Sequence, residues 1–437
     1  MPEIRPFRAL RYVAESVGDL SVVVAPPYDV IGPEEQRRLL DRHPKNVVRL
    51  DLPTAEPREE PEERYRRAAR TLAAWRSDGT FHKDPRSAVY VYEQVYRVPG
   101  SDVERTQRGF FGRVRLEPFG PSSGIRPHER TLEAPREDRY RLLRATGVNT
   151  SPVVMLHEDQ SGRTAAALAA VSTFRPAIDV RDDDGVRHRL WVVEVDGEHG
   201  PAAATLLEAA ASGPLTIADG HHRYETALRY RDERRMARSC EEDPAFDYVL
   251  TLLLETTTEP LTVLPTHRVV RELDTSHRFR EELGRMFDVR PAGRAALERE
   301  FGSALATGGR GRFGLWTRDG GSILETRPEA IELLASGVGA EVRKLDAWLL
   351  GAMLERIGGL DAAAVAAGDR IWYTKAVTEA LAAVDEGADR ATAAFLLEPT
   401  PVAAIAAVAG SGEVMPQKST YFYPKALTGL VINPHEW

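Results

Sequence analysis

The sequence of 437 residues contains a single cysteine, Cys240. One thiol cannot form a disulfide within the chain or build a metal site from several thiolates, so both are excluded. The sequence also lacks an apolar run long enough to cross a bilayer. Its first ten residues, MPEIRPFRAL, lack the apolar core of a signal peptide. A cytoplasmic protein without a membrane anchor is therefore expected.

Acidic residues outnumber basic residues in the chain. The chain has 58 lysine and arginine residues against 66 aspartate and glutamate residues, which gives a formal net charge of -8 at pH 7. A general nucleic-acid binder normally presents a basic face, so nucleic acid is not the expected partner. A local basic pocket inside an acidic shell stays open. The hydrophobic fraction of 42% is that of a globular protein, and the length predicts two or three packed units.

Apolar periodicity predicts a mixture of strands and helices. Strands are expected at 21–25, 88–98, 107–116, 189–195, 215–218 and 247–254. Helices are expected at 32–40, 64–75, 138–146 and 224–235, with two alanine-rich helices inside 165–212. The strands at 88–98 and 107–116 are expected to form an antiparallel hairpin. From about residue 272 the pattern changes to alanine-rich helices and short strands, which indicates a C-terminal domain.

The segment LTIADGHHRYETALRYR predicts an anion site at the junction of a strand and a helix. Backbone N–H groups at a helix start have no intrahelical partner and lie at the positive end of the helix dipole, so an anion such as phosphate fits there. Gly220 lets the backbone approach closely, Arg223 can pair with the anion, and His221 and His222 can add donors. The alternative is structural: Asp219 caps the helix, Gly220 forms a tight turn, and the histidines lie on the surface.

Four other segments carry side chains suited to the same ligand. These are Asp29 in PPYDVI, His128 and Glu129 in PHERT, His267 and Arg268 in LPTHR, and Lys418 and Lys425 in MPQKSTYFYPK. For Asp29 the alternative is an N-terminal helix cap, for His128 and Glu129 it is a solvated loop, and for Lys418 and Lys425 it is simple exposure. The chain has no Walker-type phosphate loop and no G-x-S-x-G turn. This set of residues favours a phosphate-bearing ligand with a carboxylate available as base or metal ligand.

Five of these stretches, PPYDVI, PHERT, ADGHHRYETA, LPTHRVV and MPQKSTYFYPK, resemble the signature stretches of the family called domain of unknown function 1015. The resemblance spans nearly the whole chain. One departure occurs in the stretch RIWYTK at 370–375, where the family usually has polar or acidic residues after the tyrosine and this chain has Lys375.

A second resemblance is to the phosphate-binding turn of the ParB/sulfiredoxin-like fold, which includes nucleotide-dependent kinases of free serine. It implies an α/β (α+β) fold with a mixed-sheet core. The catalytic or nucleotide-binding region would span residues 1–270, with an inserted segment at about 54–212. A C-terminal α+β domain, residues 271–437, would contribute the lysine and aromatic segment 415–425. By this resemblance Gly220, His221, His222 and Arg223 hold phosphate, and Asp219 orients the turn.

The function implied is a nucleotide-dependent phosphotransferase acting on a small hydroxylated metabolite, with serine and phosphoserine as the leading pair. Asp29 or Glu129 would be the base, with His128 as an alternative. Lys418 would neutralise phosphate, and ATP or ADP with Mg²⁺ would be required. Two alternatives stay open: a phosphoserine phosphatase, and a non-catalytic regulator that binds nucleotide or nucleic acid. The sequence does not identify a residue as metal ligand, and a homodimer stays open.

Overall fold

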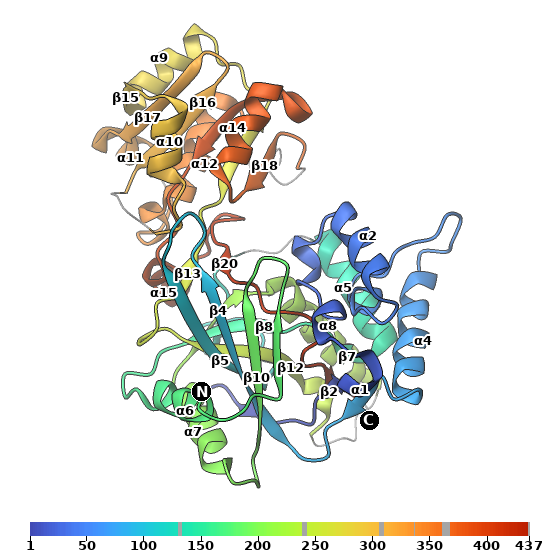
Figure 1. Cartoon of the computed structure of the whole chain (residues 1–437). Helices are drawn as coiled ribbons and strands as arrows, with labels where there is room; N and C mark the ends of the chain where they lie inside the picture. Colours follow the sequence, from blue (N-terminus) through green and yellow to red (C-terminus); the bar gives the residue numbers. More distant parts are fainter. Residues whose placement is uncertain (130–132, 238–242, 306–309, 336, 361–367, 436–437) are drawn as a thin grey trace.

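The computed structural model describes residues 1–129, 133–237, 243–305, 310–335, 337–360 and 368–435. Figure 1 shows two lobes, a lower one built on a nine-stranded sheet and an upper one built on a six-stranded sheet. The predicted mixed α/β class is confirmed. Cys240 lies outside the described residues. The expected division of the chain near residue 270 stays a prediction.

The lower sheet is mixed. Its strands pair antiparallel except for β12 with β8 and β11 with β6, which are parallel. In spatial order the strands are β6 (Ile125–Arg126), β11 (Leu215–Asp219), β8 (Val153–His157), β12 (Tyr248–Glu255), β5 (Glu104–Arg115), β4 (Ala88–Arg97), β10 (Arg187–Glu194) and β9 (Ile178–Arg181), with β1 (Ile4–Arg5) beside β5. The hairpin of β4 and β5 confirms the pairing expected from their sequences. All eight residues of β12 are buried, as expected for a strand covered on both faces.

Helices cover one face of this sheet. They are α5 (Glu133–Thr146), α6 (Arg163–Val171), α7 (Gly200–Ala211) and α8 (His221–Ala237). Leu168, Leu206 and Tyr224 pack from these helices against Val91 and Phe110 of the sheet in one apolar cluster. The helix α8 starts three residues and α5 five residues earlier than expected, while α6 starts two residues before the expected range 165–212 and α7 lies within it. Burial of this face holds α8, which begins at the site described below, against the sheet.

The N-terminal region packs beside the lower sheet as short helices around Trp75 and Leu10. Its elements are β2 (Leu10–Tyr12), α1 (Ala14–Val17), η1 (Leu20–Val22), η2 (Tyr28–Val30), α2 (Pro33–Arg42), α3 (Val48–Asp51), α4 (Glu63–Ser77) and β3 (Phe81–Lys83). The strand expected at 21–25 was wrong. The Asp19 carboxylate accepts the Ser21 N–H (2.8 Å) and starts a 3-10 turn. The Asn46 side-chain amide then donates a hydrogen bond to the carbonyl oxygen of Val22, so this oxygen is not available to a neighbouring strand.

The upper lobe contains an antiparallel sheet with helices on it. In spatial order its strands are β15 (Phe287–Pro291), β17 (Gly320–Thr326), β16 (Arg312–Thr317), β19 (Ala391–Leu396), β14 (His267–Arg271) and β18 (Ile371–Thr374). Its helices include α9 (His277–Met286), α10 (Arg294–Phe301), α11 (Pro328–Leu334), η4 (Val342–Lys344), α12 (Asp346–Gly358), α14 (Val377–Glu386) and η5 (Ala388–Arg390). The strand β18 forms an edge of this sheet.

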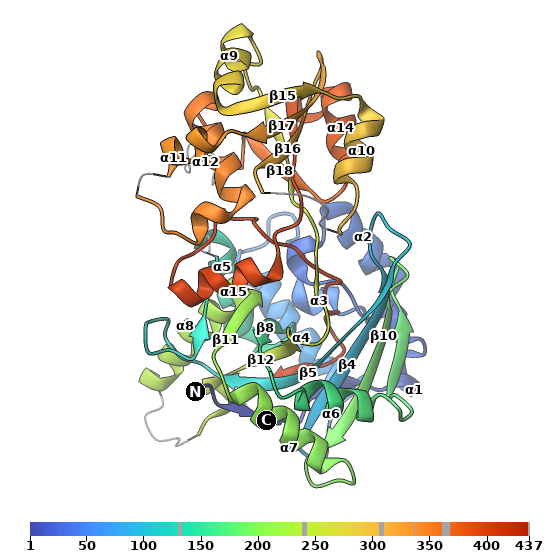
Figure 2. The ribbon, with the colours of Figure 1, turned by 90° about the vertical axis from the view of Figure 1, so that its left-hand side faces the viewer.

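The last described segment returns from the upper lobe to the lower one, as Figure 2 shows for α15 (Val402–Ser411) above the lower sheet. Next, β20 (Phe422–Tyr423) pairs with β13 (Thr262–Val263), and β21 (Asn433–Pro434) pairs with β7 (Val148–Asn149). Between these two strands, Leu427 and Val431 join the apolar cluster on the face opposite α5–α8. We call residues 412–435 the return segment. It brings residues from the far end of the chain against the centre of the lower sheet.

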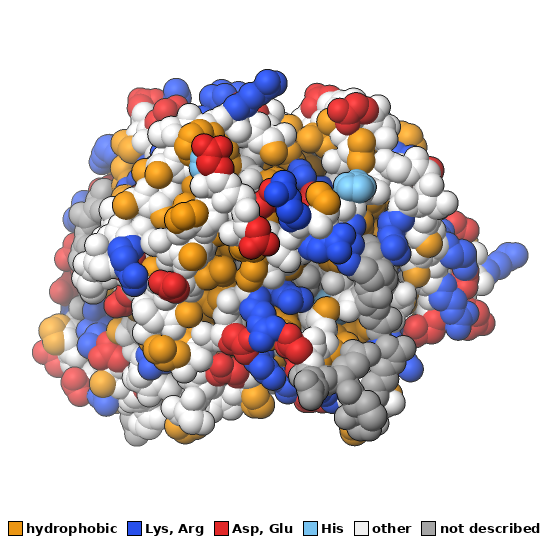
Figure 3. Space-filling model, turned by 90° about the horizontal axis from the view of Figure 1, so that it is seen from below, with side chains coloured by type: hydrophobic (Ala, Val, Ile, Leu, Met, Phe, Trp, Pro, Cys, Tyr) orange, Lys and Arg blue, Asp and Glu red, His pale blue; other side chains and the backbone are white. Residues whose placement is uncertain are grey.

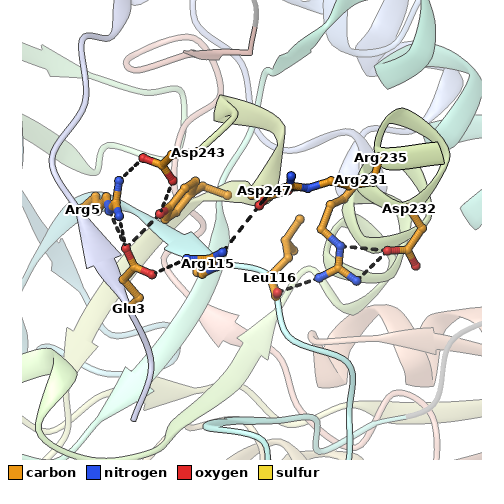
Figure 4. Close-up of polar contacts among 10 residues, drawn as sticks. Glu3, Arg5, Arg115, Leu116, Arg231, Asp232, Arg235, Asp243 and Asp247 are labelled. Atoms are coloured by element: carbon orange, nitrogen blue, oxygen red, sulfur yellow. Dashed lines mark hydrogen bonds and ion pairs between the residues drawn. The ribbon is translucent and has the colours of Figure 1, made fainter. Parts of the chain in front are cut away.

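A network of charged side chains fixes the far end of α8 to the sheet (Figure 4). Arg231 donates to the carbonyl oxygen of Leu116 (2.6 Å), and Arg235 donates to Asp247 of η3 (Ala245–Asp247) through Nε (3.0 Å). Arg115 of β5 joins Asp247 to Glu3. Because the helix is held at this end, its N-terminus has a defined position on the sheet.

Seen from below, the lower lobe shows acidic and basic side chains intermixed across its surface (Figure 3). This face therefore does not present the single-sign basic field of a general nucleic-acid binder. Among the described residues, no helix combines the length and apolar character needed to cross a membrane.

Candidate functional site

The turn that the sequence predicts to bind an anion lies where β11 ends and α8 begins. The pairing of β11 with β8 shifts register between Ile217 and Asp219, and Gly220 follows with a φ of 88°. The N–H of Tyr224 then donates to the Gly220 carbonyl (2.9 Å) and closes the first helical turn. The first N–H groups of α8 thus follow directly after the Asp219 side chain, in the arrangement that binds anions at helix starts.

The Asp219 carboxylate joins two cations from different parts of the chain. Lys425 Nζ lies 2.5 Å from Asp219 Oδ1, and Arg223 Nη2 pairs with Oδ2. Burial by itself raises the pKa of the Asp219 carboxyl, but the charges of Lys425 and Arg223 outweigh it and hold the pKa well below its usual range. Asp219 is therefore ionised and holds the return segment against the start of α8.

Arg223 uses both of its terminal nitrogens within the protein. Its Nη1 donates to the Pro152 carbonyl oxygen, and its Nη2 pairs with Asp219. The cavity left beside Asp219, Arg223 and Lys425 is only about 10 Å³ in volume, which is room for about one water molecule. An anion would therefore reach the turn from another side, and the part of Arg223 in binding it stays a prediction.

His128 is fully buried and both of its ring nitrogens are engaged. Nδ1 lies 2.5 Å from the Ile217 carbonyl oxygen, which can only accept, so Nδ1 carries the hydrogen. Nε2 then accepts from the Thr420 hydroxyl (3.1 Å). Burial lowers the pKa of His128 to about 4, so the ring is neutral at pH 7. These contacts give His128 a positioning role between β11 and the return segment.

Glu129 lies beside the same segment. Its Oε1 accepts the backbone N–H of Lys418 (3.1 Å), while residue 129 pairs with Met415 in a parallel bridge. Burial and the charge of Asp219 raise the pKa of Glu129, although Lys418 opposes the shift. The two candidate residues of the PHERT stretch are thus brought to the turn by backbone pairing with the return segment. Arg130 and Thr131 of that stretch lie outside the described residues.

Three of the six lysines in the sequence meet at this site. The ring of Tyr421 lies between two of them, 4.3 Å from Lys375 Nζ and 4.4 Å from Lys425 Nζ. Partial burial and the charges of Lys425 and Lys418 lower the pKa of Lys375. Within the described part of the chain, neither Lys375 nor Lys418 has an ion-pair partner. From the sequence, Lys375 stands out only as a departure from the family pattern. Because the chain has so few lysines, their scarcity could have marked Lys375 as a candidate site residue.

Asp29 supplies the exposed carboxylate of the cluster. It lies in η2, and the structure gives it no hydrogen bond or ion pair among the described residues. The helix-cap alternative does not hold, because α2 begins after Gly32 and has no side-chain cap. The charge of Asp29 raises the pKa values of His222 and Lys375, although burial lowers both overall. Asp29 therefore lies near enough to His222 and Lys375 to influence their pKa values, and it has no partner among the described residues.

The remaining predicted residues divide into two groups. His221 is buried and its Nε2 accepts the His128 N–H (3.3 Å), while His222 is half-buried on the first turn of α8. His267 and Arg268 lie instead in β14 of the upper lobe. His267 Nδ1 accepts the Leu397 N–H (3.2 Å). No hydrogen bond or ion pair between described residues joins this pair to Asp219 or the lysines.

The described residues contain no group of three or more histidine, cysteine, aspartate or glutamate side chains able to hold a metal ion. Mg²⁺ commonly uses one or two carboxylates together with substrate phosphates. Asp29 offers one carboxylate of the kind that would fit a Mg²⁺ ion whose other ligands are phosphate oxygens.

A family model described as "Protein of unknown function (DUF1015)" matches residues 4–348. Because the match covers most of the chain, the chain belongs to this family. The return segment lies beyond the matched residues. None of the curated proteins matches the chain.

Among solved structures, the chain is similar to a conserved hypothetical protein from Pyrococcus furiosus, at 13% identity and a TM-score of 0.34, over 68% of this chain and 87% of that one. It is also similar to a free serine kinase in complex with AMP, at 12% identity and a TM-score of 0.36, over 75% of this chain and 90% of that one. A third similar structure is SbnI with a C-terminal truncation from Staphylococcus aureus. Its identity is 11% and its TM-score 0.35, over 74% of this chain and 86% of that one. Likenesses this weak carry no argument about activity.

Replacing Gly220 with alanine is expected to lower the free energy of unfolding by about 1–3 kcal/mol, because the left-handed backbone disfavours a side chain. The new Cβ would also lie 2.9 Å from Arg223 Nε, so the guanidinium must move away from Asp219 or Pro152. Thermal unfolding measures the loss. Gly162→Ala is the matched control, since Gly162 has a φ of 70° and open space around it. An equal loss in both variants would show that Arg223 moves freely.

Proposed function

We propose that the protein is a nucleotide-dependent phosphotransferase that transfers a phosphoryl group to the hydroxyl of free serine. The observation that carries the proposal is the placement of Lys375 and Lys425 against the ring of Tyr421, with Lys425 paired to Asp219 at the start of α8. Lys418 and the exposed Asp29 lie near enough to influence the pKa of His222 on the first turn of α8. Unpaired cations next to a helix start favour a polyphosphate. The choice of serine rests on the resemblance of the D-G-H-H-R turn to that of free serine kinases.

Phosphoryl transfer needs positioning and neutralisation of charge more than covalent chemistry. Lys418 and Lys375 would neutralise the phosphates, with the first N–H groups of α8 as donors. Lys425 would contribute less, because Asp219 already balances its charge. Magnesium would enter with the nucleotide phosphates and offset their remaining charge.

Asp29 is the base in this proposal. The serine hydroxyl oxygen forms the new bond to phosphorus, the bond from phosphorus to the nucleotide oxygen breaks, and the hydroxyl proton passes to the Asp29 carboxylate. Glu129 is less suited to this role, because burial raises its pKa and its Oε1 is occupied by the Lys418 N–H. His128 is unsuited because both ring nitrogens are engaged.

Phosphorus NMR with L-serine, magnesium and ATP or ADP tests the proposal. A phosphoserine signal that requires nucleotide is expected, and Lys418→Ala should lower its rate of formation by about 10²-fold. Lys344→Ala is the control, since Lys344 lies in the upper lobe and pairs with Glu341 (2.6 Å). Release of phosphate from phosphoserine without nucleotide would favour the phosphatase instead. Nucleotide binding without turnover would favour the regulator.

A further inference from the structure

The upper lobe contains a second cavity, which is distinct from the phosphate turn. It has a volume of about 770 Å³ and lies among α12, β18 and residues 412–417 of the return segment. This volume is in the range of small-molecule binding sites. Most of the lining is apolar, including Val338, Trp348, Ile371 and Met415. The body of a ligand in this cavity would therefore be apolar.

Arg268 supplies a positive charge to the wall of the cavity. Its side chain is buried, with only 5% of the residue exposed. Nη1 donates to the Thr266 carbonyl oxygen (2.7 Å), and the guanidinium lies 5.7 Å from the ring of Tyr373. No carboxylate among the described residues forms an ion pair with it. Burial lowers the pKa of Arg268 overall, although the charge of Asp346 raises it, and these two described side chains form no ion pair. A buried cation without a carboxylate in direct contact is unfavourable, so this position favours an anionic ligand.

The carboxylates near the cavity limit the charge of that anion. Asp346 is engaged by the Gly311 N–H (2.8 Å), and Glu413 by the Glu341 N–H (3.2 Å). Glu413 and the exposed Glu355 both line the cavity. One unpaired arginine with two glutamates nearby suits a single negative charge and disfavours a polyphosphate.

Gly351 leaves room for the ligand on the helix side. It occupies the middle of α12, where glycine is a poor helix former compared with alanine. A Cβ built on it meets no atom within 4 Å, and Gly351 lines the cavity. A larger residue here would project into open space that belongs to the cavity.

We propose that this cavity binds a small monocarboxylate with an apolar body, whose carboxylate pairs with Arg268 and whose body packs against Trp348 and Met415. The lining of the cavity includes no residue of the 219–223 turn, although Met415 joins it to Glu129, and the proposal does not depend on the proposed transferase activity.

Binding of 8-anilinonaphthalene-1-sulfonate to the full chain, followed by fluorescence, tests the proposal, because this probe joins one anionic group to an apolar body. Octanoate is expected to displace the probe at least about 10-fold more strongly than 1-octanol, which lacks the charge. Arg268→Gln should abolish this preference and leave octanol unaffected. Gly351→Leu keeps Arg268 and should remove binding of both compounds.

Several results would overturn the proposal. These are equal displacement by octanol and octanoate, probe binding that survives in Gly351→Leu, or no octanoate binding at millimolar concentration. Displacement by AMP would also overturn it, because the cavity would then belong to the nucleotide site. Circular dichroism of Gly351→Leu and Arg268→Gln establishes that both variants are folded.

Discussion

The Asp29→Asn variant is expected to form phosphoserine about 10²–10⁴-fold more slowly than the wild type, the range typical of a lost general base. Asparagine keeps the size of the side chain but cannot accept the hydroxyl proton. Because Asp29 is exposed and has no partner among the described residues, thermal unfolding should not change. Initial rates by phosphorus NMR, with nucleotide binding measured separately, distinguish loss of the base from loss of binding.

Asp41→Asn is the matched control for this prediction. Asp41 is an exposed aspartate near the end of α2, the helix that follows Asp29. The same substitution there should leave the rate unchanged. A wild-type rate in Asp29→Asn would remove Asp29 from the chemistry, and Glu129→Gln would then be the next variant to measure.

The Asp219→Asn variant is expected to lose about 3–5 kcal/mol of stability in the lower lobe, because two largely buried cations lose their counter-ion. The side chains of Asp219, Arg223 and Lys425 are each no more than 14% exposed. Urea unfolding followed by tryptophan fluorescence measures the loss. The pKa of Asp219 is depressed in the folded state, so its stabilising effect is present above about pH 4 and is lost as the pH falls. The difference between variant and wild type should therefore narrow in acid.

Asp179→Asn provides the comparison for an exposed pair. Asp179 pairs with Arg187 at the surface, where the two side chains are 38% and 40% exposed. Removing that charge should cost less than about 1 kcal/mol. If Asp219→Asn costs no more than Asp179→Asn, the charges around Asp219 do not hold the return segment in place.

Local patterns predicted the elements whose stability comes from their own periodicity. The alternation in β4 and β5 and the continuous apolar run of β12 gave strands close to the observed bounds. The error at 21–25 has a tertiary cause. Those residues are apolar enough for a strand, but Asn46 satisfies their carbonyl groups and a 3-10 turn replaces the extended backbone.

The residue types of the site could be predicted, but their arrangement could not. Lys425 and Asp219 are 206 residues apart, and nothing in either segment specifies that the return segment crosses the lower sheet. Lys375 directly follows β18, a strand of the other lobe, so its position at the site depends on how the lobes are joined. Arg268 was predicted to be a phosphate ligand, but it lies in the wall of a different cavity. Its position also depends on how the two lobes are joined, which the sequence does not specify.

The return segment also sets the time at which a newly made molecule acquires its site. A ribosome adds about 5–20 residues per second, so roughly 10–40 s separate synthesis of Asp219 from that of Lys425. During this interval Asp219 and Arg223 lack their third partner, and His128 lacks the Thr420 hydroxyl. The sheet face that Leu427 and Val431 later cover is exposed over the same period. A nascent chain therefore lacks the complete cluster around Asp219, and its sheet face is vulnerable to aggregation, until the last described segment has emerged and docked.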